Sequence, residues 1–95
     1  MSATHLILQA IEKRRVIAFV YKGARRTAEP YILGHDAKGQ FMLSAVQRSG
    51  GSGTGFRTCE MEGLTALQIT DRHFTGDHPD YNPRDAYFAR VLGKV

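Results

Sequence analysis

Near the start of the chain, hydrophobic residues recur with the period of a helix. Apolar residues recur there at three- and four-residue intervals: Leu6, Ile7, Ala10 and Ile11. This spacing places them on one face of an amphipathic helix over residues 4–15. Ser2 or Thr4 suits the N-cap, and a basic triplet fills the last turn, where the helix dipole favours cations. The pattern predicts one N-terminal helix.

Beyond the helix, short β-branched and aromatic runs alternate with turn residues. Such runs predict strands, here over residues 16–21, 25–33, 40–47, 56–61 and 64–69. Lys22-Gly23 predicts a turn, and Pro30 predicts an edge position or a bend because proline cannot donate to a β-ladder. One helix followed by about five short strands predicts an α+β fold, mainly β, with a small closed or partly closed barrel.

The C-terminal part is more polar. Residues 71–83 contain Pro79 and Pro83, which predicts an extended strap, and Pro83 suits the start of a short helix through about Leu92. A length of 95 residues predicts a single domain, with a core over about residues 4–70 and a C-terminal extension over 71–95.

Charge is distributed unevenly along the chain. The formal net charge is +4, but residues 1–57 carry nine lysines and arginines against three acids, whereas residues 58–95 carry four against six. A basic half favours anionic partners through long-range attraction. A modest positive charge is also common in small domains that bind no anion, so charge alone leaves both interpretations open.

The lone cysteine, Cys59, excludes an internal disulfide. The chain shows no signal-peptide pattern, and no stretch approaches the about 20 apolar residues that cross a bilayer. We therefore expect a cytoplasmic protein without a membrane partner.

Residues of metal-ligating type gather at only one place: His73, Asp77, His78 and Asp80. Their spacing is not diagnostic, and a surface loop rich in turn residues explains it better than a metal site. Cys59 has no motif-linked histidine, and Glu29 has no partner suited to acid–base catalysis. We expect no metal, no cofactor and no catalytic activity.

Arg57 is the strongest single binding candidate. It follows the glycine-rich segment 49–55, and its guanidinium offers a rigid fork of donors that matches phosphate. An ion pair with Glu29 or Glu62 is the structural alternative. Arg25 and Arg26 are adjacent, so in a strand they point to opposite faces and only one can line a given surface. They could equally form a solvated strand edge.

Aromatic residues accompany these arginines. Stacking of a base contributes ~1–3 kcal/mol, and burial of such a side chain contributes about 1.5–3 kcal/mol, so energy does not separate binding from core packing. For Phe41 we expect core burial. Tyr21 and Tyr31 have a polar end, and we expect them to reach solvent.

The ordered series of these motifs resembles a WYL domain over about residues 6–70. The motifs are Phe19-Val20-Tyr21, Arg25-Arg26, Glu29-Pro30-Tyr31, Gly39-Gln40-Phe41-Met42-Leu43, Arg57-Thr58 and Leu64–Ile69. The resemblance implies an Sm-like, SH3-type small barrel that senses ligands in bacterial transcription regulation, often nucleotides or single-stranded DNA. It also implies that Phe41-Met42-Leu43 occupies the name-giving tripeptide.

The resemblance further implies ligand-surface positions for Tyr21, Arg26, Arg48 and Arg57; Arg25, Tyr31, Phe41 and Met42 are further candidates. We therefore expect noncatalytic binding of a nucleotide or a single-stranded nucleic acid. The alternative is an assembly module that binds a protein regulator or a second copy of itself. Departures from the family pattern favour that alternative: Met42, Glu60 and Gly63.

Overall fold

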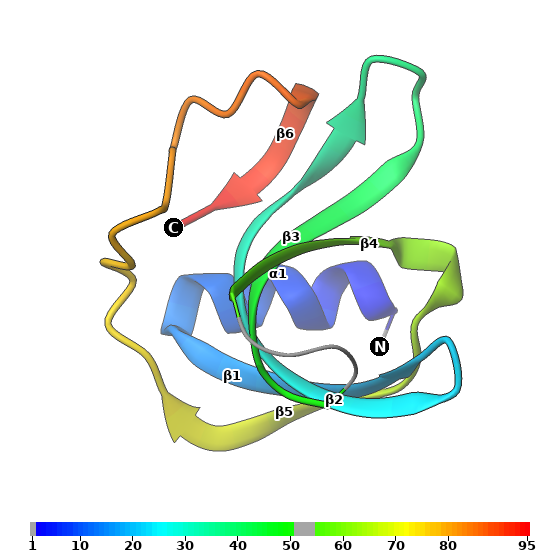
Figure 1. Cartoon of the computed structure of the whole chain (residues 1–95), viewed down its shortest axis with the longest axis vertical. Coiled ribbons are helices and arrows are strands. Elements are labelled where there is room, and N and C mark those ends of the chain that lie inside the picture. Colours follow the sequence, from blue (N-terminus) through cyan, green and yellow to red (C-terminus); the bar gives the residue numbers. More distant parts are fainter. Residues whose placement is uncertain (1, 51–54) are drawn as a thin grey trace.

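The computed structural model describes residues 2–50 and 55–95 as an N-terminal helix and a six-stranded antiparallel sheet (Figure 1). In chain order the elements are α1 (Ala3–Lys13), β1 (Arg15–Tyr21), β2 (Ala24–Asp36), β3 (Phe41–Ser49), β4 (Gly55–Glu60), the 3₁₀ helix η1 (Met61–Gly63), β5 (Thr65–His73) and β6 (Phe88–Lys94). The predicted α+β, mainly β fold is confirmed.

Helix α1 begins and ends at two residues with identifiable roles. The Ser2 hydroxyl accepts a hydrogen bond from the His5 amide at 3.2 Å, which makes Ser2 the N-cap. Arg14 adopts the left-handed conformation (φ 54°) and ends the helix, so β1 starts at the next residue. The helix therefore ends two residues earlier than predicted. Ile7, Ala10 and Ile11 are its buried residues.

The strands follow the order β4-β3-β2-β1-β5, and β6 pairs with β2. Lys22 and Gly23 both have positive φ angles, 50° and 77°, which suits the tight turn of the β1–β2 hairpin. β4 and β5 stand at the two ends of the order and do not pair among the described residues, so the sheet is not closed. A closed barrel, one of the two predicted forms, is thus wrong, since the closing pair of strands is missing; the partly closed barrel stays a prediction.

Strand β2 changes partner in its middle. Residues 24–28 pair with β1, residues 32–36 pair with β6, and β3 runs along the other side. Pro30 lies between the two partners, next to a register shift against β3. Proline has no N–H to donate, but Pro30 pairs with neither β1 nor β6, so no hydrogen bond to these strands is lost. The prediction was an edge position or a bend, and the structure places a change of partner strand and a register shift at Pro30.

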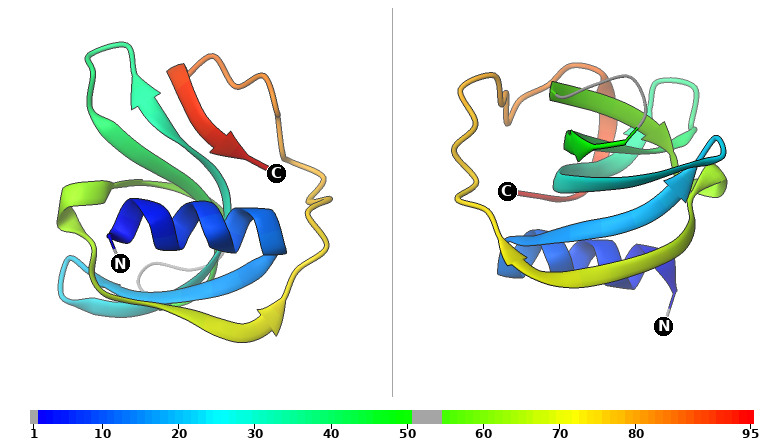
Figure 2. Two further views of the ribbon diagram at one scale, coloured as in Figure 1. Left: turned by 180° about the vertical axis from the view of Figure 1, so that it is seen from behind. Right: turned by 60° about the horizontal axis from the view of Figure 1, so that its bottom comes forward.

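Two hydrophobic cores lie on opposite faces of β3. Leu43 and Ala45 belong to the helix-side core, which also contains Ile7, Ile11, Ile17 and Phe19. Met42 and Val46 belong to the strap-side core, completed by Val16, Tyr31, Ile32, Phe74 and Phe88. Figure 2 shows α1 against the sheet, and α1 contacts β1, β2, β5 and β6. Alternate residues of β3 therefore serve two cores.

The C-terminal extension crosses the molecule and returns as a strand. Residues 74–87 contain no helix or strand, as expected for the predicted strap. Hydrogen bonds from the Phe74 amide to the Arg14 carbonyl (3.0 Å) and from the Tyr81 hydroxyl to the Val95 carbonyl (2.6 Å) hold this segment.

The predicted last helix is wrong, because Phe88–Lys94 forms β6. The segment beyond Pro30 in β2 offers a free strand edge, and pairing with it satisfies the backbone groups of β6. The apolar pattern over the same residues is too weak to specify a helix. Six strands therefore replace the expected five.

Tyr31 lies at the centre of the strap-side core, and its loss should destabilise the fold. The side chain is 1% exposed, and its ring lies 4.7–5.3 Å from the rings of Tyr81, Phe56 and Phe74. We expect Tyr31→Ala to lower the free energy of unfolding by about 3–5 kcal/mol in urea titrations. Tyr87→Ala is the control, because Tyr87 is 41% exposed; it should cost about 1 kcal/mol or less. Equal losses in the two variants would contradict this assignment.

Candidate functional site

Three cationic side chains lie near enough to the thiol of Cys59 to affect its pKa, and two of them belong to the β1–β2 hairpin. We name Lys22, Arg26 and Arg57 the basic cluster. The Lys22 Nζ lies 5.5 Å and the Arg26 Cζ 5.4 Å from the centre of the Tyr21 ring. All three cations act on the thiol of Cys59, lowering its pKa against a larger effect of burial. Arg57 and Cys59 alternate along β4, so they share one strand face, toward the helix-side core.

Arg26 is held in a defined position. Its Nη1 donates a hydrogen bond to the Gln47 Oε1 at 3.0 Å, and Gln47 is 2% exposed. The Gln47 Nε2 in turn donates to the Gly50 carbonyl. The Arg26 Nε is buried and has no hydrogen-bond partner within residues 2–50 and 55–95. The hydrogen bond to Gln47 thus fixes the position of the guanidinium.

Tyr21 supports this cluster from the inside. Its ring is only 8% exposed, and its hydroxyl accepts a hydrogen bond from the Glu60 amide at 3.2 Å. A Cβ on Gly63 would lie 2.9 Å from the Tyr21 Cε1, so a glycine is needed where the ring packs. The expectation that Tyr21 reaches solvent is wrong, because β4 and η1 cover it.

Arg57 makes one local hydrogen bond, from its Nη1 to the Phe56 carbonyl at 3.1 Å. The expected alternative was an ion pair with Glu29 or Glu62. Among the described residues, Glu29 pairs instead with Arg48 (Nε to Oε2, 3.7 Å). No ion pair of Arg57 is found in that part of the chain.

The other predicted arginines lie elsewhere. Arg48 and Gln47 alternate on β3, so Arg48 projects to the face opposite Gln47 and Arg26, where it pairs with Glu29. Arg25 is exposed. The sequence prediction missed Lys22, which was treated as a turn residue only. The signal for it was its place directly after Tyr21 in a two-residue turn.

The remaining candidates divide between the core and a cavity. Tyr31 is 1% and Met42 6% exposed in the strap-side core, so the expectation that Tyr31 reaches solvent is wrong. The strap covers Tyr31, and the His78 amide donates a hydrogen bond to its hydroxyl at 3.1 Å. Phe41 is partly buried, packs on the helix-side core, and stacks on His35 with ring centres 4.9 Å apart.

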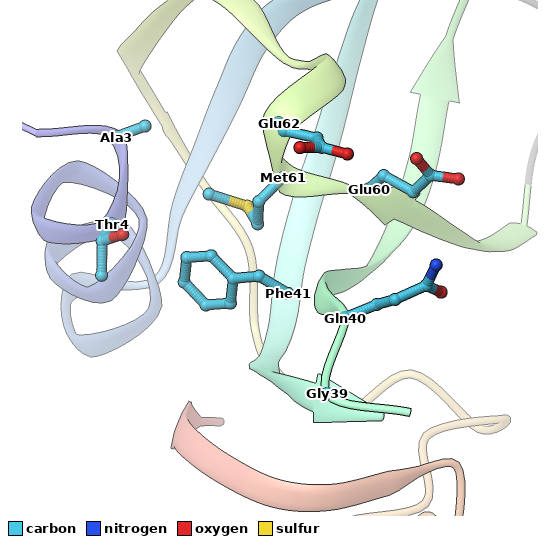
Figure 3. Close-up of a pocket in the computed structure, with 8 residues that line it drawn as sticks. All are labelled: Ala3, Thr4, Gly39, Gln40, Phe41, Glu60, Met61 and Glu62. Atoms are coloured by element: carbon cyan, nitrogen blue, oxygen red, sulfur yellow. The ribbon is translucent and has the colours of Figure 1, made fainter. Parts of the chain in front are cut away.

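The basic cluster lines neither of two cavities that described residues form. The larger cavity, of about 480 Å³, is lined by Ala3, Thr4, Gly39, Gln40, Phe41, Glu60, Met61 and Glu62 (Figure 3). The smaller cavity, of about 230 Å³, is lined by Ser44, Phe56, Thr58, Asp80, Tyr81, Asn82 and Asp85. Both are lined by carboxylates and contain no lysine or arginine. The basic cluster is therefore a surface site, and the acidic side chains lie apart from it.

The thiol of Cys59 is poorly suited to nucleophilic chemistry. It is 3% exposed, and burial raises its pKa despite the nearby cations Arg26, Lys22 and Arg57. Since the thiolate is the reactive form, the protonated thiol is inert. Within residues 2–50 and 55–95, no group of three or more His, Cys, Asp or Glu side chains could hold a metal ion. No helix of that part is long and apolar enough to span a membrane.

Comparisons with protein-family models, with curated proteins and with solved structures find no match for this chain.

Cys59 should react slowly with iodoacetamide in the native protein. The raised pKa keeps the thiol protonated at pH 8, and the helix-side core covers it. Unfolding in urea restores an ordinary, exposed thiol that ionises near its usual pKa of about 8.5. Mass spectrometry of the alkylated protein measures both rates, without interference because Cys59 is the lone cysteine. Equally fast labelling of native and unfolded protein would contradict the buried, protonated state.

The raised pKa of the Cys59 thiol also makes the stability of the protein depend on pH. The native thiol has the higher pKa, so it retains its proton where the unfolded thiol loses it. Its contribution to stability is fully present below the unfolded pKa of about 8.5 and is lost as the pH rises from there toward the folded pKa. Urea midpoints should therefore fall less steeply above pH 8.5 in Cys59→Ala than in the wild type. Parallel curves for the two proteins would contradict this contribution.

Proposed function

We propose that this chain is a noncatalytic recognition module of the WYL type, which binds the phosphate of a nucleotide or single-stranded nucleic acid through the basic cluster. One observation carries the proposal. Arg26 is fixed between Tyr21 and Gln47, and its guanidinium has no ion-pair partner in the described chain. A phosphate would supply the missing anion.

The electrostatics favour an anion at this place. None of the cations of the basic cluster has an ion-pair partner among the described residues. Charge-assisted bonds from a guanidinium are also about twice as strong as neutral ones.

The stacking role shifts from tyrosine to arginine in this proposal. Tyr21 is buried, and Arg26 lies over its ring at 5.4 Å. The opposite face of the guanidinium is then the surface on which a base would stack, as bases do on arginine planes. Tyr21 positions Arg26, whereas Arg26 and Arg57 contact the ligand.

The architecture supports the Sm-like, SH3-type part of the proposal. β2 has 13 residues and bends at Pro30, so one strand contributes to both halves of the sheet. Such bending curls a sheet toward a partly open barrel. The helix-side core fills the concave side.

A second candidate function is self-assembly through β6. In the described chain β6 pairs with β2 alone, which leaves its other edge open. Val91 and Leu92 on this strand are 44% and 42% exposed. An open edge beside exposed apolar side chains favours pairing with β6 of a second copy.

Binding to single strands should depend on the arginines of the basic cluster. Fluorescence anisotropy of labelled single-stranded DNA and RNA oligonucleotides should show binding that weakens with salt. We expect Arg57→Ala and Arg26→Ala each to weaken it about tenfold or more, the effect of losing a charge-assisted contact of roughly 1.5–3 kcal/mol. Arg26→Lys keeps the charge but loses the fork, so it should restore only part of the affinity.

Arg84→Ala is the matched control, because it removes one positive charge from an exposed residue of the strap. It should keep nearly the full affinity. If Arg84→Ala lost as much affinity as Arg57→Ala, binding would depend only on the net charge of the protein and not on the basic cluster. Wild-type binding that is absent at tens of micromolar protein would refute the proposed ligand class.

Self-assembly is tested by size-exclusion chromatography with light scattering. A dimer through β6 should dissociate in Leu92→Lys, because the new charge would be buried at the strand pair. Arg84→Ala should stay dimeric. A wild-type monomer at all accessible concentrations would refute this second candidate.

A further inference from the structure

The larger cavity differs chemically from the basic cluster. It lies between the first turn of α1, the β2–β3 turn and η1 (Figure 3). Its volume of about 480 Å³ falls within the range of about 300–1,000 Å³ that is typical of small-molecule sites. The sequence prediction assigned no function to this place.

One side of the cavity is apolar and rigid. Figure 3 shows Met61 and the ring of Phe41 on the side toward α1. Met61 is 6% exposed, and the Phe41 ring is backed by His35, nearly parallel to it at 17°. A ligand would therefore meet an aromatic face and a thioether that are already in place.

The other side of the cavity is polar and negative. The side-chain ends of Glu60, Glu62 and Gln40 lie together there (Figure 3). Neither glutamate has an ion-pair partner within residues 2–50 and 55–95.

We propose that this cavity binds a small organic cation, an ammonium group carried on an apolar body. The ammonium would lie near the carboxylates of Glu60 and Glu62, and the apolar body would pack on Met61 and Phe41. An ammonium near an aromatic face gains a further cation–π attraction. No lysine or arginine lines the cavity, so an anion of the same shape meets repulsion. This site is independent of the basic cluster and of its proposed ligand.

The test compares two probes of matched size and opposite charge. Phenethylammonium and 3-phenylpropionate are titrated into ¹⁵N-labelled protein and followed by ¹H–¹⁵N correlation spectra. Phenethylammonium should give saturable shifts of the amides of residues 39–41 and 60–63, whereas 3-phenylpropionate should leave them unchanged. Equal binding of both probes, shifts elsewhere on the protein, or no saturable shift at millimolar phenethylammonium would overturn the proposal.

Glutamine variants of the cavity carboxylates remove their charge and keep the shape of the cavity. Glu60 and Glu62 are exposed, so the double variant Glu60→Gln/Glu62→Gln should remain folded, which its dispersed spectrum would verify. It should bind phenethylammonium about tenfold more weakly, the upper end of what two solvent-exposed ion pairs contribute. Glu12→Gln, on the exposed end of α1, is the control and should bind as the wild type does. Unchanged affinity in the double variant would refute the role of the carboxylates.

Arg57→Ala distinguishes this site from the basic cluster. It should leave phenethylammonium binding unchanged while weakening oligonucleotide binding. Loss of both activities in Arg57→Ala would contradict the independence of the two sites.

Discussion

The bend of β2 at Pro30 is the constraint on which the rest of the structure depends. It allows one strand to pair with β1 before the bend and with β6 after it, while β3 follows its whole length. Both faces of β3 are then covered, one by α1 and the other by the strap and β6. The residue at the bend is a proline because a missing N–H there breaks no ladder bond to either partner. The bend also separates the hairpin that carries Arg26 from the turn that borders the larger cavity.

Successive side chains of β4 point to opposite faces of the sheet, which separates its cation from its carboxylate. Arg57 and Cys59 face one way, toward the helix-side core and the basic cluster, whereas Thr58 and Glu60 face the other way. One short strand thus contributes a cation to one site and a carboxylate to another. The backbone amide of Glu60 also donates a hydrogen bond to the Tyr21 hydroxyl. That bond also fixes the ring on which Arg26 rests.

Local patterns in the sequence were sufficient for the elements up to residue 73. Capping by Ser2, the Lys22-Gly23 turn and the bend at Pro30 depend on residues a few positions apart, so they could be predicted. The last strand could not, because Phe88–Lys94 becomes a strand only through pairing with distant residues 32–36. The site was predicted in part for the same reason. Arg26 does lie over the ring of Tyr21, but the ion pair of Arg48 with Glu29 and the burial of Tyr31 under the strap depend on tertiary contacts.

The long return of the chain through the strap has a consequence for the order of folding. β1, β2, β3 and β4 are joined through neighbours in the sequence, so their pairing closes short loops. The pairing of β6 with β2 closes a loop of more than 50 residues and carries a larger entropic cost. The pairing of β1 with β5 also joins distant segments, from Val20 paired with Thr65 to Arg15 paired with His73. We therefore expect both pairings to form after the hairpins of β1 to β4. Amide hydrogen exchange would then be faster along β6 than along β3, although both strands belong to one sheet.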